Sequence, residues 1–229
     1  MKAILLAAGF GTRLKPLTNT IPKCLVPIKG IPLLKIWIDN LLNIGIDEIL
    51  INTHYLSEQV VNFIVENGYN KICKVIYEPV LLGTAGTLIA NLDFLKDDEC
   101  LLIHADNYFP TSLKSYLFAH KGRPLPCLMT MLTFRTDNPS LCGIVEIDSQ
   151  GIVIGFHEKI KQPPGNLANG AVYLITNELV KSIKNKMPYL KDFSTEVIKG
   201  FLGKIYSYET NEIFIDIGTP ETYELANRY

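Results

Sequence analysis

The sequence lacks any apolar run long enough to cross a membrane, and it lacks an excess of positive charge. Its longest apolar stretches have the length of one strand, whereas a membrane-spanning helix needs about 20 apolar residues. The 22 Lys and Arg residues are balanced by 23 Asp and Glu residues, for a net charge of −1, and no basic run occurs. These absences argue against membrane and nucleic-acid partners.

Cysteine and histidine are also scarce, with five Cys and four His in 229 residues. The number of Cys is odd, their spacing is wide, and no Cys-x-x-Cys pair occurs, so disulfides and zinc sites are not expected. The pattern instead predicts reduced, buried thiols in a cytoplasmic protein. The residues concerned are Cys24, Cys73, Cys100, Cys127 and Cys142.

The N-terminal stretch begins as a buried strand and ends in a glycine loop. Residues 3–8 are apolar without interruption, which is typical of a central parallel strand. Gly9 and Gly11 follow, and glycines allow a sharp turn and a close approach of the backbone to a ligand. The loop is not a P-loop, because Gly-x-x-x-x-Gly-Lys-Ser/Thr is absent. It is not the dinucleotide fingerprint either, because Leu14 stands where the third glycine would be.

Two basic residues near this loop indicate what it binds. Exposed peptide N–H groups in such a loop can converge on an anion. Arg13 adds a fork of donors that suits phosphate oxygens, and Lys23 adds a point charge. The simplest ligand for this combination is a polyphosphate.

The next segments alternate between helix and strand. Apolar residues recur with a helical period over residues 31–44, a strand is expected over 48–52, and a helix capped by Ser57 over 57–66. Such alternation predicts a mostly parallel sheet with helices on both faces. Ligands of these sheets bind at the carboxyl ends of the strands. Four residues follow apolar strands and are expected to share that rim: Gly9, His54, Glu78 and Asp106. No role is assigned to His54.

Glu78 and the glycines of residues 83–86 favour a nucleobase as the ligand. The glycines allow close approach to a flat group, although a plain helix start is the alternative. A carboxylate at neutral pH only accepts hydrogen bonds. Guanine offers two adjacent N–H donors that match it, whereas uracil and thymine offer one donor between two carbonyl groups. Glu78 therefore tilts the prediction toward guanine without excluding a pyrimidine.

Two aspartates are candidates for a metal site. Asp106 follows the apolar run 100–105, where a turn cap is the alternative reading, and Asp216 lies between Ile215 and Ile217. These isoleucines are expected to be buried, so an unpaired charge on Asp216 would be costly there, and a divalent cation would be a natural partner. Mg²⁺ needs few protein carboxylates, because phosphate oxygens and waters complete its coordination.

The second part of the chain has a different texture. Residues 127–134, 143–147 and 153–156 are predicted as strands, with a hairpin turn over 148–151. The adjacent pair Glu158 and Lys159 would by itself indicate only a solvated surface pair.

Several strings together are more specific than any one of them. Residues 7–18 read AAGFGTRLKPLT, residues 22–28 read PKCLVPI, residues 83–86 read GTAG, and residues 214–223 read FIDIGTPETY. In order, they resemble the motifs of the sugar-1-phosphate nucleotidylyltransferases, over nearly the full chain. The resemblance implies a Rossmann-like α/β fold with a mixed, mostly parallel sheet flanked by helices. It implies a single domain over 1–229, with a nucleotide-binding half (1–125) and a sugar-phosphate-binding half (126–229).

The resemblance also implies roles for individual residues. It implies that Arg13, Lys23, Asp106 and Asp216 are the catalytic residues and that the two aspartates bind Mg²⁺. The nucleotide is bound by Ala7, Ala8, Gly9, Gly11, Thr12, Arg13, Lys23, Glu78, Gly83, Thr84, Ala85 and Asp106. The sugar phosphate is bound by Asn107, Gly143, Glu158, Lys159 and Asn169. The string of residues 169–173 follows Glu158 and Lys159 at the distance expected in the family, and this reverses their interpretation as a surface pair. Relatives usually have Gly-Asp where this chain has Ala105-Asp106, and often an aromatic residue at the place of Cys142.

The implied reaction transfers a nucleotidyl group from an NTP, with GTP favoured, to a sugar 1-phosphate and releases pyrophosphate. The sugar is expected to be mannose-like, including manno-heptose 1-phosphates for surface polysaccharides. Two rivals remain: a regulatory paralogue without turnover, and an enzyme that uses UTP, dTTP or CTP or a non-sugar phosphate such as phosphocholine. A homodimer is considered among the partners.

Overall fold

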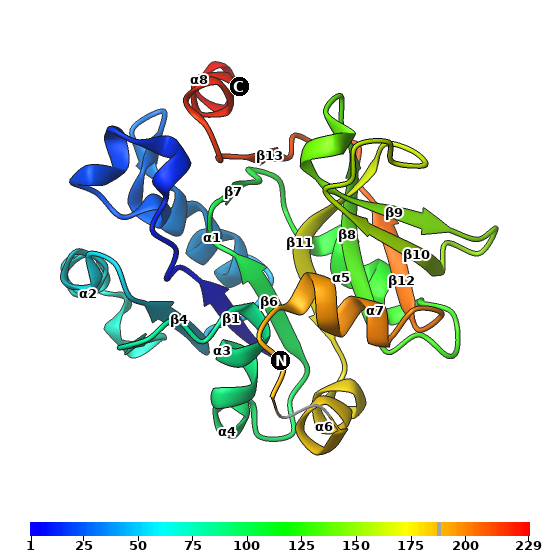
Figure 1. Ribbon diagram of the computed structural model, residues 1–229. Coiled ribbons are helices and arrows are strands. Elements are labelled where there is room, and N and C mark those ends of the chain that lie inside the picture. The colour runs from blue at the N-terminus through cyan, green and yellow to red at the C-terminus, as the bar shows by residue number, and fades with distance from the viewer. Residues whose placement is uncertain (187–188) are drawn as a thin grey trace. The chain divides into compact units, whose positions relative to one another are not determined.

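The computed structural model describes residues 1–186 and 189–229, and the chain forms two compact units (Figure 1). The first, which we call the glycine-loop unit, comprises residues 2–81, 103–113 and 212–229. The second, the strand-rich unit, comprises Met1, 82–102 and 114–211. Strand β6 (Cys100–His104) contributes residues to both. The units are interleaved in sequence, because the chain leaves and re-enters each of them.

A parallel sheet forms the centre of the glycine-loop unit. Its strands are β1 (Lys2–Leu6), β4 (Ile49–Thr53) and β5 (Cys73–Tyr77), and both neighbouring pairs are parallel. Leu6 lies opposite Asn52, and Asn52 lies opposite Ile76, so the three strands end at the same edge. Strands β1 and β4 are buried almost throughout, as their unbroken apolar sequences predict.

Two helices connect these strands and differ slightly from the sequence prediction. Helix α1 (Leu33–Leu42) begins later than residue 31, because β3 (Ile31–Pro32) pairs with β2 (Pro27–Ile28). Helix α2 (Ser57–Glu66) packs against β5. Its predicted cap is wrong: Ser57 is the first helical residue, and its hydroxyl bonds Thr53 Oγ1 at 2.7 Å instead of capping the helix.

The unit is completed by segments from the middle and the end of the chain. Strand β7 (Asn107–Tyr108) pairs antiparallel with β13 (Ile215–Asp216), and helix α8 (Pro220–Arg228) follows. The Thr219 side chain caps α8 in a reciprocal capping box with Thr222. Short 3₁₀ helices lie over Thr12–Leu14, Leu17–Asn19, Lys23–Leu25 and Tyr69–Lys71.

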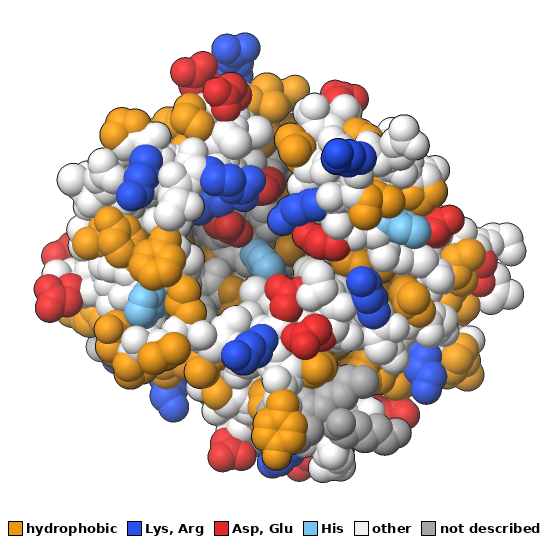
Figure 2. Space-filling model, in the orientation of Figure 1, with side chains coloured by type: hydrophobic (Ala, Val, Ile, Leu, Met, Phe, Trp, Pro, Cys, Tyr) orange, Lys and Arg blue, Asp and Glu red, His pale blue; other side chains and the backbone are white. Residues whose placement is uncertain are grey.

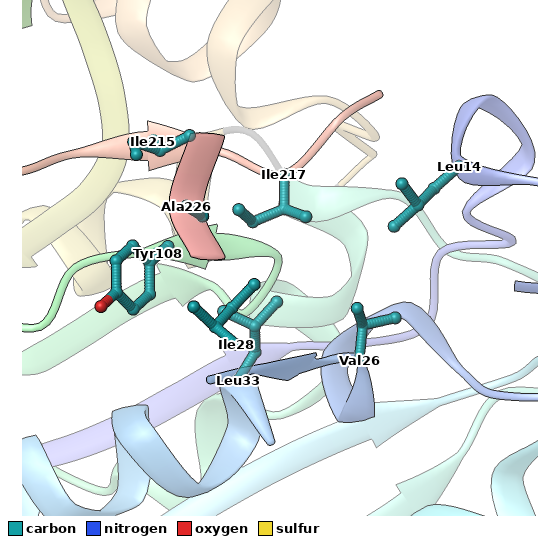
Figure 3. Close-up of a cluster of buried hydrophobic side chains, with 8 residues drawn as sticks. All are labelled: Leu14, Val26, Ile28, Leu33, Tyr108, Ile215, Ile217 and Ala226. Atoms are coloured by element: carbon teal, nitrogen blue, oxygen red, sulfur yellow. The ribbon is translucent and has the colours of Figure 1, made fainter. Parts of the chain in front are cut away.

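A cluster of buried apolar side chains joins these distant segments (Figure 3). Leu14 comes from the glycine loop, Ile215 and Ile217 flank Asp216, and Tyr108 lies on β7. Val26, Ile28, Leu33 and Ala226 complete the cluster. Because several of these residues are near neighbours in sequence of predicted functional residues, the packing of the core determines where those functional residues lie.

The strand-rich unit has a mainly antiparallel sheet. Its pairs are β9 (Gly143–Ile147) with β10 (Val153–Glu158), β11 (Leu167–Ile175) with β8 (Met129–Arg135) and with β9, and, in parallel, β12 (Ile205–Glu209) with β8. The predicted turn over 148–151 closes the β9–β10 hairpin, with Gly151 at φ +77°.

Helices of this unit lie against its strands and in its connections. Helix α5 (Lys114–Lys121) packs on β8 and β12, and α7 (Ile198–Gly200) packs on β10. The others are α3 (Thr84–Ala90), α4 (Leu92–Leu95), α6 (Asn177–Lys186) and a π-helical turn over Phe193–Val197. Asp192 caps this turn by accepting a hydrogen bond from Thr195 N at 2.7 Å. The predicted fold class, a mixed sheet with flanking helices, is confirmed.

The distribution of surface charges and the state of the cysteines agree with the composition. On the face shown in Figure 2, Lys and Arg side chains are interspersed with Asp and Glu. Within the described residues, no helix is both long and apolar enough to cross a membrane. All five cysteines are free thiols, and four are buried, while Cys142 is partly exposed. Burial raises the pKa of Cys24 and of Cys73 to about 12, so these thiols stay protonated at neutral pH.

One buried histidine in the strand-rich unit makes its stability depend on pH. His120 on α5 contacts Thr130 Oγ1 through Nδ1 at 2.7 Å, and its Nε2 lies 3.5 Å from Glu99 Oε1. Burial lowers the pKa of His120 from 6.5 to about 4, and the nearby Arg123 charge also acts to lower it. The folded protein therefore holds this imidazole neutral at pH values where the unfolded chain protonates it.

We expect the free energy of unfolding to fall by about 1–2 kcal/mol between pH 7 and pH 5 through His120 alone, because the unfolded chain gains the proton over this range. Urea unfolding at both pH values measures the loss, and His120→Asn, which can keep the bond to Thr130, should remove that part of it. A variant with the parent's full pH dependence would contradict the assignment.

Candidate active site

The glycine loop leaves the sheet after β1 and is closed by local bonds. Gly11 has φ +63°, and an added Cβ would lie 2.9 Å from Thr18 Cγ2, so only glycine fits there. Thr18 Oγ1 donates to Gly11 O at 2.7 Å, and Leu14 N donates to the same oxygen at 3.0 Å. At Gly9 a Cβ would meet no atom within 4 Å, which leaves room beside the backbone.

Four charged side chains of the glycine-loop unit form a continuous series. Lys23 Nζ lies 2.7 Å from Asp106 Oδ2 and 3.6 Å from Asp216 Oδ1. Arg13 Nη2 lies 3.9 Å from Asp216 Oδ2. The Lys23 side chain is largely buried, whereas Arg13 and Asp216 are more than half exposed. Positive and negative groups alternate, so the series is neutral as a whole.

The expectation that Asp216 would be buried between its isoleucines is wrong. Successive side chains of a strand point to opposite faces, so Ile215 and Ile217 enter the core while the carboxylate of Asp216 points away and is 52% exposed. Asp216 is held near Asp106 by the β7–β13 pairing and by Ile217 N, which donates to Asp106 O at 3.3 Å.

The acidity of Asp106 reflects opposing effects. Burial raises the pKa of its carboxyl group, but the Lys23 ammonium and His104 outweigh burial and lower the pKa below its usual value. A small cleft opens beside this pair at the end of β1. It is lined by Leu6, Ala7, Gly9, Lys23, Cys24 and Asp106.

The remaining residues predicted for the nucleotide divide between the two units. Ala8 and Thr12 belong to the glycine loop and its 3₁₀ turn. Gly83, Thr84 and Ala85 begin α3 in the strand-rich unit, where residues 191–193 hold them. Ala85 N donates to Lys191 O at 2.9 Å, and Phe193 N donates to Thr84 Oγ1 at 2.7 Å. Gly83 has φ +82°, and any Cβ there would collide with Lys191 O.

Glu78 follows β5 and is only 3% exposed. Asn52 Nδ2 donates to Glu78 Oε1 at 2.9 Å, and Glu78 N donates to Thr53 O at 2.8 Å. The Nδ1 atom of His54 lies 2.7 Å from Glu78 O. Three consecutive residues at the end of β4 thus hold Glu78.

The residues predicted for the sugar phosphate lie mainly in the strand-rich unit. A Cβ on Gly143 would lie 2.6 Å from Phe156 Cζ and 2.8 Å from Glu158 Oε2, so a larger residue at this position would displace these two side chains. Glu158 Oε1 pairs with Lys159 Nζ at 3.2 Å, and Lys159 has φ +49°. Asn169 Nδ2 donates to Tyr173 Oη at 2.7 Å, next to an irregularity in the β8–β11 pairing.

Asn107 belongs to the glycine-loop unit instead. It is buried on β7, and its backbone oxygen accepts a hydrogen bond from Trp37 Nε1 at 2.9 Å. The structure therefore places four of the five sugar-phosphate residues in one unit and Asn107 beside Asp106 in the other.

The two aspartates suit a divalent cation. Both carboxylates already reach one positive group, the Lys23 ammonium. Within the described residues, no group of three or more His, Cys, Asp or Glu side chains is arranged to hold a metal. A cation at Asp106 and Asp216 would thus need phosphate oxygens and waters to complete its coordination, as Mg²⁺ commonly does.

The glycine loop and the charged series lie near the carboxyl end of β1, which is the end of a parallel sheet where ligands bind, and the two cations have the chemistry that suits phosphate groups. The model of the family described as nucleotidyl transferase matches residues 2–229. The chain belongs to the nucleotidyl transferase family.

Relatives of known name show which members of the family this chain resembles. The chain is 31% identical to D-glycero-alpha-D-manno-heptose 1-phosphate guanylyltransferase of Campylobacter jejuni, over 97% of each chain. It is 31% identical to mannose-1-phosphate guanyltransferase of Saccharomyces cerevisiae, over 97% of this chain and 63% of that protein. It spans 62–63% of the length of several curated relatives. The resemblance to sugar-1-phosphate nucleotidylyltransferases is confirmed.

A solved structure shares the fold. It is a Bacillus anthracis protein named "Putative Glucose-1-Phosphate Thymidylyltransferase", in complex with a sucrose. The TM-score is 0.88 at 24% identity, over 100% of this chain and 94% of that one. This likeness concerns the fold alone.

Sequence reasoning missed two residues that organise the site. Asn52 interrupts a buried apolar strand, and a buried polar side chain needs partners, so its position was a usable signal. Thr18, which closes the loop onto Gly11, is buried and gave no comparable signal, because its partner is a backbone oxygen.

We expect Lys23→Met to lower the free energy of unfolding by about 1–2 kcal/mol, because Asp106 and Asp216 would then face each other without the ammonium between them. Lys35→Met is the matched control: Lys35 pairs with Asp39 at 2.7 Å on the exposed side of α1, and its loss should be worth less than about 0.5 kcal/mol. Equal losses in urea unfolding would show that the buried lysine is not held by the carboxylates.

Proposed function

We propose that the protein transfers a nucleotidyl group from an NTP to a sugar 1-phosphate, giving an NDP-sugar and pyrophosphate. The observation that carries the proposal is the alternating series Arg13, Asp216, Lys23 and Asp106 beside the glycine loop. It supplies two cations for phosphate oxygens and two carboxylates for a metal ion.

The reaction makes few chemical demands on the protein. An oxygen of the sugar phosphate attacks the α-phosphorus, the bond from this phosphorus to the bridging oxygen breaks, and pyrophosphate leaves with the bond's electrons. A phosphate monoester is largely ionised at neutral pH, so no general base is required. Catalysis then depends on positioning and on neutralising charge.

The charged series suggests how triphosphate binding begins. Arg13 is exposed, and its contact with the Asp216 carboxylate is long, at 3.9 Å. The guanidinium group can therefore turn to phosphate oxygens at little cost. Lys23 is anchored by two carboxylates and lines the cleft at the end of β1, where it would meet the α- or β-phosphate. Backbone N–H groups of residues 8–12 would hold the remaining oxygens, since Ala7 N already donates to Asn52 Oδ1 at 2.8 Å.

The cofactor in this proposal is Mg²⁺, held by Asp106 and Asp216. When bound, it would neutralise charge on the triphosphate and on the leaving pyrophosphate. The carboxylates would release Lys23 in part as they engage the ion, which frees the ammonium for phosphate.

For the acceptor substrate, we assign the phosphate to Lys159, which is exposed and carries a positive charge. Glu158 and Asn169 would bind sugar hydroxyls, because one accepts and the other both donates and accepts. Gly143 would allow the sugar to approach, and Asn107 would contact the sugar phosphate near Asp106.

The proposed base is guanine, read by Glu78 with Gly83, Thr84 and Ala85 against the ring. The carboxylate accepts the two adjacent N–H donors that only guanine offers. The mannose-like sugar and the role in surface polysaccharide synthesis in the cytoplasm rest on analogy with guanylyltransferases of related sequence.

Pyrophosphate release tests the reaction. GTP, UTP, dTTP, CTP and ATP are each combined with several sugar 1-phosphates and phosphocholine, with Mg²⁺ present. We expect GTP with a manno-configured sugar phosphate to give the highest kcat/KM, and Asp216→Asn to be inactive but folded. No release from any pair would overturn the proposed activity, while a tenfold preference for a pyrimidine nucleotide would overturn only the base.

Two further variants test how the substrates are divided between residues. Lys159→Ala should raise the KM for sugar phosphate at least about tenfold with little change in the KM for NTP, since a charged hydrogen bond is worth roughly 1.5–3 kcal/mol. Arg13→Ala should do the opposite. Steady-state kinetics with one substrate varied at a time will separate them, and the same substrate weakened in both variants would refute this division.

A further inference from the structure

Asn52 is a polar residue in the central strand of the parallel sheet. It lies on β4 between Leu6 of β1 and Ile76 of β5, and only 4% of it is exposed. The rest of this strand is apolar apart from Thr53 at its end. A buried amide is expensive unless its donor and acceptor are both used.

Both ends of the Asn52 amide have fixed partners. Ala7 N, at the start of the glycine loop, donates to Oδ1 at 2.8 Å. Nδ2 donates to Glu78 Oε1 at 2.9 Å. A peptide N–H can only donate and a carboxylate can only accept, so the amide has one allowed orientation. The Asn52 side chain therefore connects the glycine loop to the carboxylate of Glu78, which follows β5.

We propose that Asn52 is a positioning residue that sets the base preference of the enzyme by orienting Glu78. The inference rests on the proposed function, in which Glu78 reads the base. Thr53 and His54 hold the backbone of Glu78, whereas Asn52 acts on its carboxylate. The bond from Asn52 to Oε1 restricts the rotation of the carboxylate, and it thereby limits the directions from which the group can accept hydrogen bonds from a base.

The fixed polarity of Asn52 makes an unusual prediction for Glu78→Gln. Nδ2 of Asn52 donates to the side chain at position 78, so we expect the new amide to turn its oxygen toward Asn52. A base that reaches this side chain would then meet the NH₂ group. The side chain at position 78 would then donate a hydrogen bond to the base instead of accepting one. Adding Asn52→Asp reverses this bond, because the amide at position 78 now donates its NH₂ to the carboxylate at position 52. Its oxygen then faces the base, while Ala7 N keeps an acceptor.

The experiment measures kcat/KM for GTP and UTP in the parent, Asn52→Asp, Glu78→Gln and the double variant at pH 8. In Asn52→Asp the two neighbouring carboxyl groups can no longer make the bond from Nδ2 to Oε1. We expect Asn52→Asp to lower the GTP:UTP ratio about tenfold or more, because two carboxylates repel each other. Glu78→Gln should lower the ratio too, and the double variant should recover part of it. The KM for sugar phosphate should stay unchanged throughout.

Thermal unfolding of the same proteins provides a readout that is independent of turnover. Asn52→Asp should lower the Tm by roughly 3–10 °C, and Glu78→Gln should restore part of that loss in the double variant. Asn40→Asp is the matched control: Asn40 is also buried and donates through Nδ2, to Phe109 O at 2.9 Å. It should lower the Tm without changing the GTP:UTP ratio.

A GTP:UTP ratio in Asn52→Asp equal to the parent's, or a double variant no more selective for GTP than Glu78→Gln, would overturn the inference while leaving the proposed function intact. If the parent turns over no substrate pair, the proposed function fails, and the same ratio is then taken from the affinities of GTP and UTP in thermal-shift titrations. Equal affinities in all four proteins would overturn the inference as well.

Discussion

The arrangement of the glycine-loop unit depends on one largely buried ammonium group. Lys23 lies within ion-pair distance of two carboxylates from distant parts of the sequence, on segments that meet through the β7–β13 pairing. An isolated charge with so little exposure would be costly, and two carboxylates near each other would repel, so each group makes the others tolerable. In the proposed function, the same balance would let the series exchange partners when phosphate and a cation bind together.

The apolar cluster around Leu14, Ile215 and Ile217 supports this balance from behind. Each of these side chains packs inward while a charged neighbour, Arg13 or Asp216, points out. The positions of the charges are therefore set by hydrophobic packing that is insensitive to salt, whereas their interactions with one another are electrostatic and would change when a charged ligand binds. A site that must bind a highly charged substrate benefits from this separation of framework and function.

Much of the fold and part of the candidate site could be predicted from the sequence. The apolar runs, the glycines and the strand-end positions of Glu78 and Asp106 follow from local rules, and the ordered motifs supplied Asp216. Other features depended on long-range contacts. Local sequence did not show that Asp216 faces away from its isoleucines into solvent, or that Ser57 bonds Thr53 instead of capping α2. It also did not show that residues 191–193 hold Thr84 and Ala85. Asn52 could have been noticed, but its two partners come from other segments of the chain.

The single allowed orientation of the Asn52 amide bears on how such a protein changes its substrate over evolutionary time. If Glu78 reads the base, a single nucleotide change would turn its side chain from an acceptor into a donor of hydrogen bonds, because the codons of Glu and Gln differ only in the first position. Asn52 would then determine which way the new amide faces. The specificity of the pocket would be coded in pairs, with residue 52 setting the polarity and residue 78 presenting it. Lineages that keep Asn52 would have a short mutational path between acceptor and donor readers, and those that lose it would have none.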